Sequence, residues 1–219
     1  MSTDLEREKR LAAEAAAAIV EDGMAVGLGT GSTAAHFLRA LAQRRLRLRC
    51  VATSLETERA AVDLGLPVEP FSGLGALGEL HIAVDGADQI AKDGWVVKGG
   101  GGAHTREKIV AAAATRFVVI ASSDKLVERV AAPIPLELLD FGLRATLEWL
   151  AQAEVRDAAP TPDGGILADW RGPVDDPRAL SALLSRDPGI VEHGLFPPEL
   201  VSDVLVGRED AVERVSTRG

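Results

Sequence analysis

The chain has 219 residues, 47% of them apolar and 26% charged, a composition typical of a soluble globular protein. Its formal net charge of −9 argues against a broad basic face for nucleic acid. We find no apolar run long enough for a membrane span or a signal peptide, so we expect no membrane partner and a cytoplasmic location. The single cysteine, Cys50, excludes an intrachain disulfide.

The first part of the chain alternates between short apolar runs and amphipathic stretches. This periodicity predicts helices near 4–20, 32–42, 55–64 and 105–114, and strands near 24–28, 46–52, 82–84, 95–97 and 117–121. Thr105 is the expected N-cap of the fourth helix. Repeated strand–turn–helix units predict an α/β domain built on a parallel sheet.

The pattern changes at Pro133. From 134 to 196 the order is strand, helix, strand, strand, helix, strand, which predicts a smaller α+β domain of the split βαβ, ferredoxin-like type. Residues 204–206 resemble a core strand and are expected to return to the first domain. We therefore predict one domain over 1–131 plus 204–219, with 132–203 inserted into it.

A glycine turn between the first strand and the second helix is a candidate phosphate site. In Gly29-Thr30-Gly31-Ser32-Thr33, backbone N–H groups and a helix N-terminus would face an anion, and the hydroxyls of Thr30, Ser32 and Thr33 add donors. A P-loop would need a lysine after Gly31, and none follows. A looser dinucleotide fingerprint fits, but the next strand ends at Thr53-Ser54 rather than at an acid, which disfavours a nicotinamide cofactor.

Carboxylates and a lysine follow two further predicted strands. Asp85 and Asp88 end one, Lys98 and four glycines end the next, and Glu107 lies in the first turn of the following helix. Because sites in open parallel sheets form at the carboxyl ends of strands, we expect these four residues to line one cleft with the Gly29–Thr33 turn. The alternatives are solvated Asp-Gly turns, a surface lysine, and a first-turn acid that complements the helix dipole.

Such groups suit the enolisation of an α-hydroxy aldehyde. The carboxylate of Glu107 could move a proton between adjacent carbons, and the ammonium of Lys98 could stabilise the oxyanion that develops. Metal binding is disfavoured because His36, His81, His104 and His193 lack metal-site spacing. His104 lies close to the candidate base, either as a pocket residue or as a loop histidine without a ligand role.

Together these motifs resemble ribose-5-phosphate isomerase, type A, over nearly the whole chain. The resemblance implies a Rossmann-like domain with a smaller α+β domain, a homodimer or homotetramer, a sugar phosphate as the partner, and no cofactor or metal. It implies Glu107 as the base, Lys98 as the group that stabilises the enediolate, and Asp85, with Asp88 beside it, as the group that assists ring opening. The substrate contacts that it implies also include Lys9, Thr30, Gly31, Ser32, Thr33, Gly86, Ala87, Gly99, Gly100, Gly101 and Lys125.

This sequence departs from the family pattern in a few places. Gln89 stands where an acid is usual, Gly102 and His104 replace more typical residues, and 127–133 lacks the usual Leu-Gly-Lys-like segment. Two other function classes stay open. One is a non-catalytic sugar-phosphate sensor on the same scaffold, and the other is a related enzyme such as an aminosugar-phosphate deaminase or a coenzyme A transferase.

Overall fold

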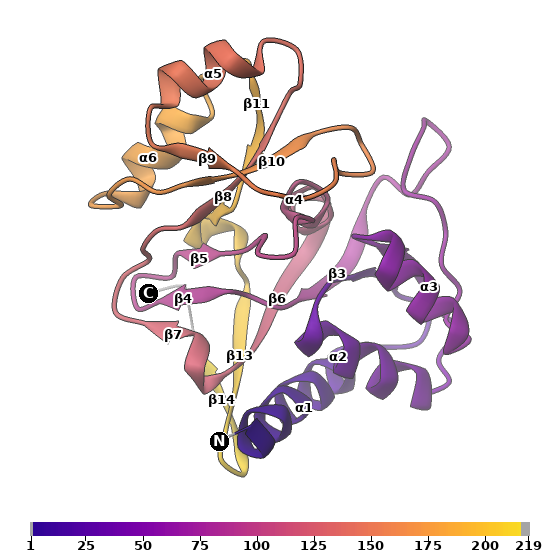
Figure 1. Cartoon of the computed structure of the whole chain (residues 1–219). Coiled ribbons are helices and arrows are strands. Elements are labelled where there is room, and N and C mark those ends of the chain that lie inside the picture. The colour runs from indigo at the N-terminus through magenta and orange to yellow at the C-terminus, as the bar shows by residue number, and fades with distance from the viewer. Residues whose placement is uncertain (1, 216–219) are drawn as a thin grey trace. The chain divides into compact units, whose positions relative to one another are not determined.

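The computed structural model describes residues 2–215 and divides into two compact units (Figure 1). The first comprises Met1–Ala87, Arg106–Lys125 and Pro198–Gly219, and the second comprises Asp88–Thr105 and Leu126–Pro197. This division differs from the predicted bounds. Residues 88–105 and 126–131 belong to the second unit, and 198–203 belong to the first.

A six-stranded sheet forms the centre of the first unit. Its order is β14-β13-β6-β3-β1-β2, and all neighbours are parallel except the antiparallel pair β13–β14. This confirms the predicted parallel sheet and the return of residues 204–206 to it. The strands are β1 (Ala25–Leu28), β2 (Arg49–Ala52), β3 (Leu80–Asp85), β6 (Ala114–Ser122), β13 (Asp203–Arg208) and β14 (Ala211–Val215).

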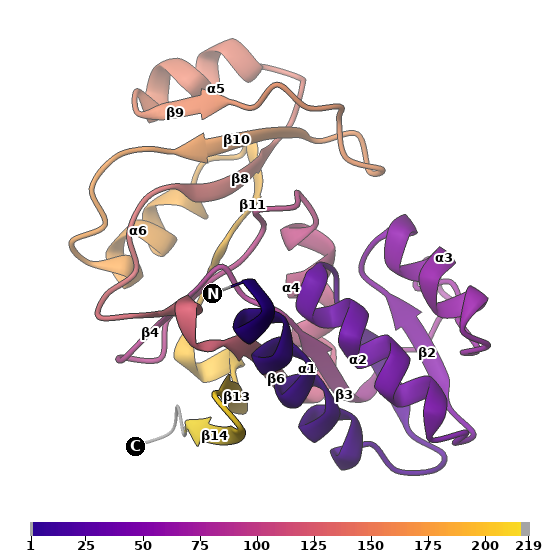
Figure 2. The same cartoon turned by 60° about the horizontal axis from the view of Figure 1, so that its bottom comes forward.

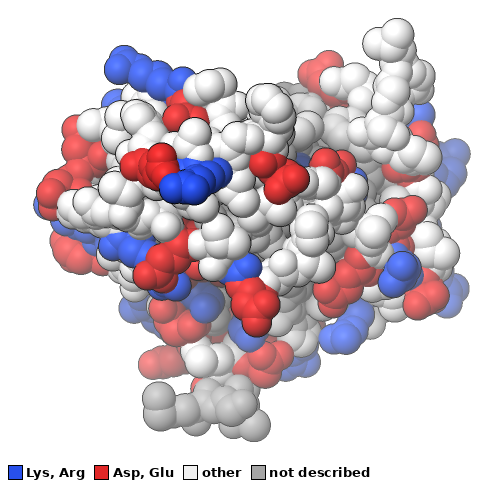
Figure 3. Space-filling view, turned by 45° about the horizontal axis from the view of Figure 1, so that its top comes forward, with Lys and Arg blue, Asp and Glu red and all other residues white. Residues whose placement is uncertain are grey.

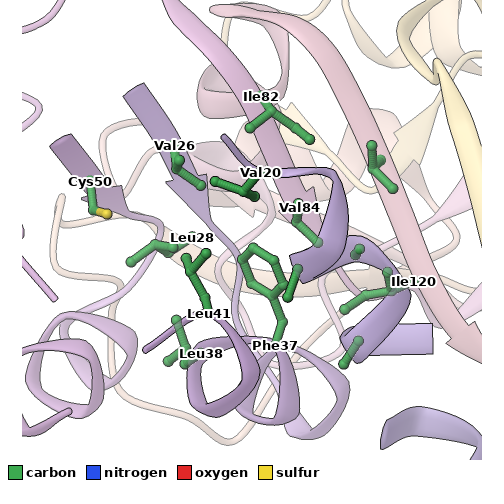
Figure 4. Packing of buried hydrophobic residues seen from close by; sticks show 14 of the residues in the cluster. Val20, Val26, Leu28, Phe37, Leu38, Leu41, Cys50, Ile82, Val84 and Ile120 are labelled. Atoms are coloured by element: carbon green, nitrogen blue, oxygen red, sulfur yellow. The ribbon is translucent and has the colours of Figure 1, made fainter. Parts of the chain in front are cut away.

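Helices cover both faces of this sheet. The first three helices of the chain pack on one face. There, side chains from alternate positions of the strands, such as Val26 and Val84, form an apolar cluster with Phe37 (Figure 4). The opposite face meets the fourth helix, because a Cβ placed at Gly27 would lie 2.4 Å from Val110. The helices are α1 (Ser2–Ile19), α2 (Ser32–Gln43), α3 (Leu55–Asp63) and α4 (His104–Ala112).

The first helix owes its close packing to small side chains. Ala12, Ala13, Ala16 and Ala17 are all buried in the cluster, and alanine allows a neighbouring helix to approach closely without loss of side-chain entropy. The helices α1 and α2 accordingly lie side by side (Figure 2). This packing fixes α2, and with it the glycine turn from which α2 starts.

The second unit contains an antiparallel sheet of order β11-β8-β10-β9. Along the chain its elements run strand, helix, strand, strand, helix, strand, which confirms the predicted split βαβ, ferredoxin-like arrangement. Ile134, Leu136 and Leu138 of the central strand pack against both helices in a separate apolar cluster. The elements are β8 (Ile134–Leu138), α5 (Leu143–Leu150), β9 (Ala153–Val155), β10 (Ile166–Trp170), α6 (Pro177–Leu184) and β11 (Ile190–His193).

A second, smaller sheet in this unit corrects one expectation. The predicted strand at 95–97 does not join the parallel sheet, because it forms a hairpin with the strand before it. The tight turn at 92–94 closes the hairpin, and the N–H of Ala91 donates to the carbonyl of Trp95 at 2.9 Å. The order is β12-β5-β4-β7, with β4 (Gln89–Ala91), β5 (Val96–Val97), β7 (Leu126–Val127) and β12 (Leu195–Phe196).

The start of α4 corrects the predicted N-cap of this helix. Thr105 is not the N-cap, because the helix already begins at His104. The hydroxyl of Thr105 instead donates to the carboxylate of Glu137, which is 2% exposed and also accepts a hydrogen bond from Thr161 at 2.6 Å. The remaining elements are short 3₁₀ turns, η1 (Ser123–Lys125) and η2 (Pro198–Leu200). Within 2–215, every helix is too short or too polar to span a membrane.

Candidate active site

Asp85, at the carboxyl end of β3, fastens the glycine turn that follows β1. Its Oδ1 atom accepts hydrogen bonds from the backbone N–H groups of Thr30 at 3.0 Å and Gly86 at 2.7 Å. The approach is so close that a Cβ at Gly29 would lie 2.2 Å from the Asp85 carboxyl carbon. Only glycine fits there, and this carboxylate is held rigidly at the edge of the first unit's sheet.

The Thr30 hydroxyl is engaged within the protein, which revises the expectation that it is a donor for a phosphate. It lies 2.8 Å from Thr53 Oγ1, 2.9 Å from Ser54 Oγ and 3.0 Å from Thr57 Oγ1. A hydroxyl has a single proton, and the bond from Thr30 to Ser54 uses it, so none is left to donate to a phosphate. Thr57 in turn donates to the carbonyl of Gly29 at 3.0 Å, and the cluster therefore sets the path of the turn.

The start of α2 keeps the features expected of an anion site. Gly31 is the N-cap with φ 107°, a conformation that favours glycine, and no side chain caps the helix. Gly31 and Ser32 are exposed, whereas Thr33 is 9% exposed. The first N–H groups of a helix have no carbonyl partner inside it, and they carry the positive end of the helix dipole. An anion at this turn would meet backbone donors.

Glu107 belongs to the first unit and is only 5% exposed. It lies in the first turn of α4, one turn before Val110, which packs against β1. Since the C-terminus of α4 leads into the first residues of β6, the helix runs antiparallel to the strands. Its first turn is therefore directed toward the edge of the sheet where Asp85 lies.

Two lysines expected to contact substrate also belong to the first unit. The ammonium of Lys9 donates to Glu6 at 2.7 Å, and this bond, with one from His36, lowers the pKa of Glu6 to about 2. Lys125 lies in η1, with its ammonium 3.4 Å from Asp124. Since η1 directly follows β6, Lys125 is placed near the carboxyl end of that strand.

A buried glutamate holds η1 in place. Glu8 of α1 is 6% exposed and accepts hydrogen bonds from the N–H and hydroxyl of Ser123 at 2.8 and 2.7 Å, and from the N–H of Glu209 at 3.1 Å. Burial acts to raise the pKa of Glu8, but these bonds outweigh it and leave the pKa below its ordinary value. No sequence pattern indicates this role, because Glu8 lies in a charged helical stretch.

Lys98 belongs to the second unit and is 2% exposed. Its N–H donates to the carbonyl of Gly194 at 2.9 Å, and its ammonium lies 5.7 Å from the centre of the Phe196 ring. A Cβ at Gly194 would come within 2.2 Å of the Lys98 carbonyl oxygen. The lysine is thus held by β12 and its neighbours, with its charge over an aromatic face.

The glycine turn after Lys98 is held from two sides. Gly100 donates its N–H to Asp88 Oδ2 at 2.8 Å. Arg156, which follows β9, donates to the carbonyls of Gly99 at 3.0 Å and Gly100 at 3.2 Å. Arg156 was not among the predicted site residues, because it lies more than fifty residues further along the chain in a stretch whose pattern predicts only a short strand.

Two of the departures from the family pattern have structural explanations. His104 is the first residue of α4 rather than a loop residue, and its fully buried ring fills the space beneath Gly99, where a Cβ would lie 2.6 Å from Nδ1. Gln89 donates to the carbonyl of Ala131 and accepts from its N–H, both at 2.8 Å. A carboxylate could not make both bonds, which explains the amide opposite the altered 127–133 segment.

Neither the surface charge nor the arrangement of possible metal ligands identifies a further feature of the site. On the face drawn in Figure 3, acidic and basic side chains are interspersed rather than gathered into a broad basic patch. Among residues 2–215, no group of three or more His, Cys, Asp or Glu side chains could hold a metal ion. The site residues divide between the units, and the expectation that Asp85, Asp88, Lys98 and Glu107 line one cleft stays a prediction.

Comparison with known proteins gives a consistent result. The family model for ribose 5-phosphate isomerase A (phosphoriboisomerase A) matches residues 49–211. The chain is 42% identical to ribose-5-phosphate isomerase A from Sphingopyxis alaskensis and 43% identical to that from Halobacterium salinarum, with 94% of each chain covered in both cases.

Solved structures agree with the sequence relatives. Ribose 5-phosphate isomerase A from Neisseria gonorrhoeae matches with a TM-score of 0.91 and 30% identity, over 98% of both chains. A D-ribose-5-phosphate isomerase in complex with phospho-erythronic acid matches with a TM-score of 0.89 and 30% identity, over 97% of this chain and 99% of the other.

Proposed function

Since the chain belongs to the ribose 5-phosphate isomerase A family, we propose that it interconverts D-ribose 5-phosphate and D-ribulose 5-phosphate, a step of the non-oxidative pentose phosphate pathway. The reaction moves a proton from C2 to C1 of the open-chain aldose and the hydroxyl proton from O2 to O1. An enediolate is the intermediate. The observation that carries the proposal is the family match together with Glu107, a buried acid at the position of the family's base.

We assign Glu107 as the base, since a carboxylate is ionised near pH 7 and can accept the C2 proton. Lys98 supplies a fixed positive charge for the enediolate oxygen, and such preplaced charges are strongest where water is excluded. Its 2% exposure supports this role. Asp85 assists ring opening, with Asp88 beside it. No cofactor or metal enters this scheme.

The phosphate and hydroxyls of the sugar would be bound by the turns described above. The backbone N–H groups of Gly31, Ser32 and Thr33 suit the phosphate, because Thr30 uses its own hydroxyl and N–H within the protein. The other proposed contacts are Lys9, Gly86, Ala87, Gly99, Gly100, Gly101 and Lys125. The resemblance to the family also supports a homodimer or homotetramer and a cytoplasmic location.

A sugar-phosphate sensor without activity is not favoured, because the relatives that match over nearly the full chain carry the name of an isomerase. A deaminase-like or transferase-like enzyme is disfavoured on the same ground. Both alternatives predict that no ketopentose phosphate forms from ribose 5-phosphate.

The test compares the wild-type protein with Glu107→Gln in a ribulose 5-phosphate formation assay that contains a chelator. The amide keeps the shape but cannot take the proton, so turnover should fall by about 10²–10⁴-fold while KM changes little. The matched control is Glu56→Gln, since Glu56 is an exposed first-turn acid in α3. If Glu107→Gln retained more than about a tenth of wild-type turnover, another group would be the base.

A further inference from the structure

We propose that Arg156 is a positioning residue for the reaction, acting by orienting the backbone of the glycine turn Gly99–Gly102. This inference rests on the proposed function, because it names a group that sets the geometry of the same site. Arg156 lies in the turn after β9, and its side chain is 17% exposed. Both the arginine and the turn belong to the second unit.

The guanidinium group makes three hydrogen bonds in a fixed plane. Its Nη1 atom donates to the carbonyls of Gly99 at 3.0 Å and Gly100 at 3.2 Å. Its Nη2 atom donates to Oδ1 of Asp169, on β10, at 2.6 Å. The ion pair with Asp169 holds the guanidinium and balances its charge, so Arg156 orients the carbonyls without leaving an unpaired cation.

Peptide planarity then determines where the N–H groups of the turn point. A trans peptide holds its C=O and the following N–H in opposite directions. With the Gly99 carbonyl on Arg156, the N–H of Gly100 points away, and it donates to Asp88 at 2.8 Å. The Gly100 carbonyl accepts a hydrogen bond from the same Arg156 Nη1 atom. The N–H of the next residue, the exposed Gly101, therefore also points away from the arginine.

The turn has a hydrogen bond of its own, from the N–H of Gly102 to the carbonyl of Gly99 at 3.0 Å, and this bond leaves the Gly100 carbonyl unheld. Glycine has more backbone freedom than any other residue, so ordering the run costs more conformational entropy than ordering other residues. Gly99 has φ 100°, and Gly102 has φ 78° with a would-be Cβ 2.5 Å from Leu167, so the turn needs glycine at both positions. Arg156 and Asp88 supply from outside the rigidity that the glycines lack.

The test uses Arg156→Met, which keeps an unbranched apolar stem and removes the guanidinium, and Arg156→Lys, which keeps the charge but not the fork. The matched control is Arg171→Met. Arg171 lies 3.6 Å from the same Asp169 and 3.1 Å from Glu154, and its side chain is 49% exposed. Within residues 2–215 the side chain of Arg171 pairs with these two acids and makes no hydrogen bond to Gly99 or Gly100.

For both Arg156 variants we expect kcat to fall by about 10–100-fold, the scale of a small misplacement of binding groups. KM for ribose 5-phosphate should change far less, and the loss of affinity for phospho-erythronic acid, whose carboxylate resembles the enediolate, should follow kcat. Arg171→Met should keep kcat and the affinity for phospho-erythronic acid close to their wild-type values.

The possible outcomes separate this inference from the proposed function. If wild type and Arg171→Met turn over and either Arg156 variant does so equally well, the positioning role is refuted. If Arg156→Met fails to fold, as judged by circular dichroism, Arg156→Lys decides the question. If even the wild-type protein forms no ribulose 5-phosphate, the proposed function fails, and the loss is not attributable to Arg156.

Discussion

Replacement of Glu8 by glutamine tests whether the carboxylate beneath η1 stabilises the first unit. The wild-type carboxylate accepts three hydrogen bonds, at 2.7, 2.8 and 3.1 Å, from Ser123 and Glu209. In Glu8→Gln one oxygen becomes an NH₂ group, which must face a donor whichever way the amide turns. One charge-assisted bond is therefore lost, and the others weaken to neutral bonds.

Glu8→Gln should lower the free energy of unfolding by about 2–4 kcal/mol. The lost bond accounts for about 1.5–3 kcal/mol and the weakened bonds account for the remainder. Urea unfolding at pH 7 measures it. The control is Glu6→Gln on the same helix, where the side chain is 52% exposed and its ion pair with Lys9, being solvated, should contribute little to stability.

The pH dependence gives a second readout. The pKa of Glu8 is lowered in the folded protein from its ordinary value of 4.5. The stability that it contributes is therefore fully present above pH 4.5, and is lost as the pH falls through the lower, folded value. The difference in the free energy of unfolding between wild type and Glu8→Gln should therefore narrow as the pH is lowered from 7 to 4 and below. Equal stability at pH 7, or a gap that does not narrow, would refute this reasoning.

Two other experiments test the close packing at Gly29 and the burial of Cys50. Gly29→Ala should lower turnover by about 100-fold, because the new Cβ would lie 2.2 Å from the Asp85 carboxyl and 2.6 Å from its Cα, whereas Gly75→Ala, with nothing within 4 Å, should have wild-type kinetics. Equal kinetics for the two would contradict the close approach. Cys50 is fully buried and its pKa is raised to about 12, chiefly by that burial, so a thiol reagent at pH 8 should label it only after unfolding. Rapid labelling of the native protein would show that the thiol is accessible.

Much of this protein is determined locally. The continuous apolar runs at 25–28 and 82–84, and the 3.6-residue period that places Phe37 and Leu41 on one face of α2, are patterns that one stretch of chain displays by itself. The motifs at Gly29–Thr33, Asp85–Asp88 and Lys98–Gly101 are equally local, since each depends on neighbours in the chain. For this reason the sequence sufficed for the fold class, with its split βαβ arrangement, and for the family, but not for the bounds of the two units.

Partners distant along the chain were decided only by the tertiary structure. Val96 and Val97 look like any buried strand, and it is their pairing with the distant β12, together with the hairpin to β4, that places them in the smaller sheet. Thr30 looks like a phosphate donor until Thr53, Ser54 and Thr57 occupy its hydroxyl.

Glu8 and Arg156 each look like one more charged residue on a solvated stretch, whereas in the structure each organises a turn from a distant part of the chain. Hydrogen bonds between distant residues leave no periodicity in the sequence. They depend on the packing that brings donor and acceptor together, and only the folded chain supplies it.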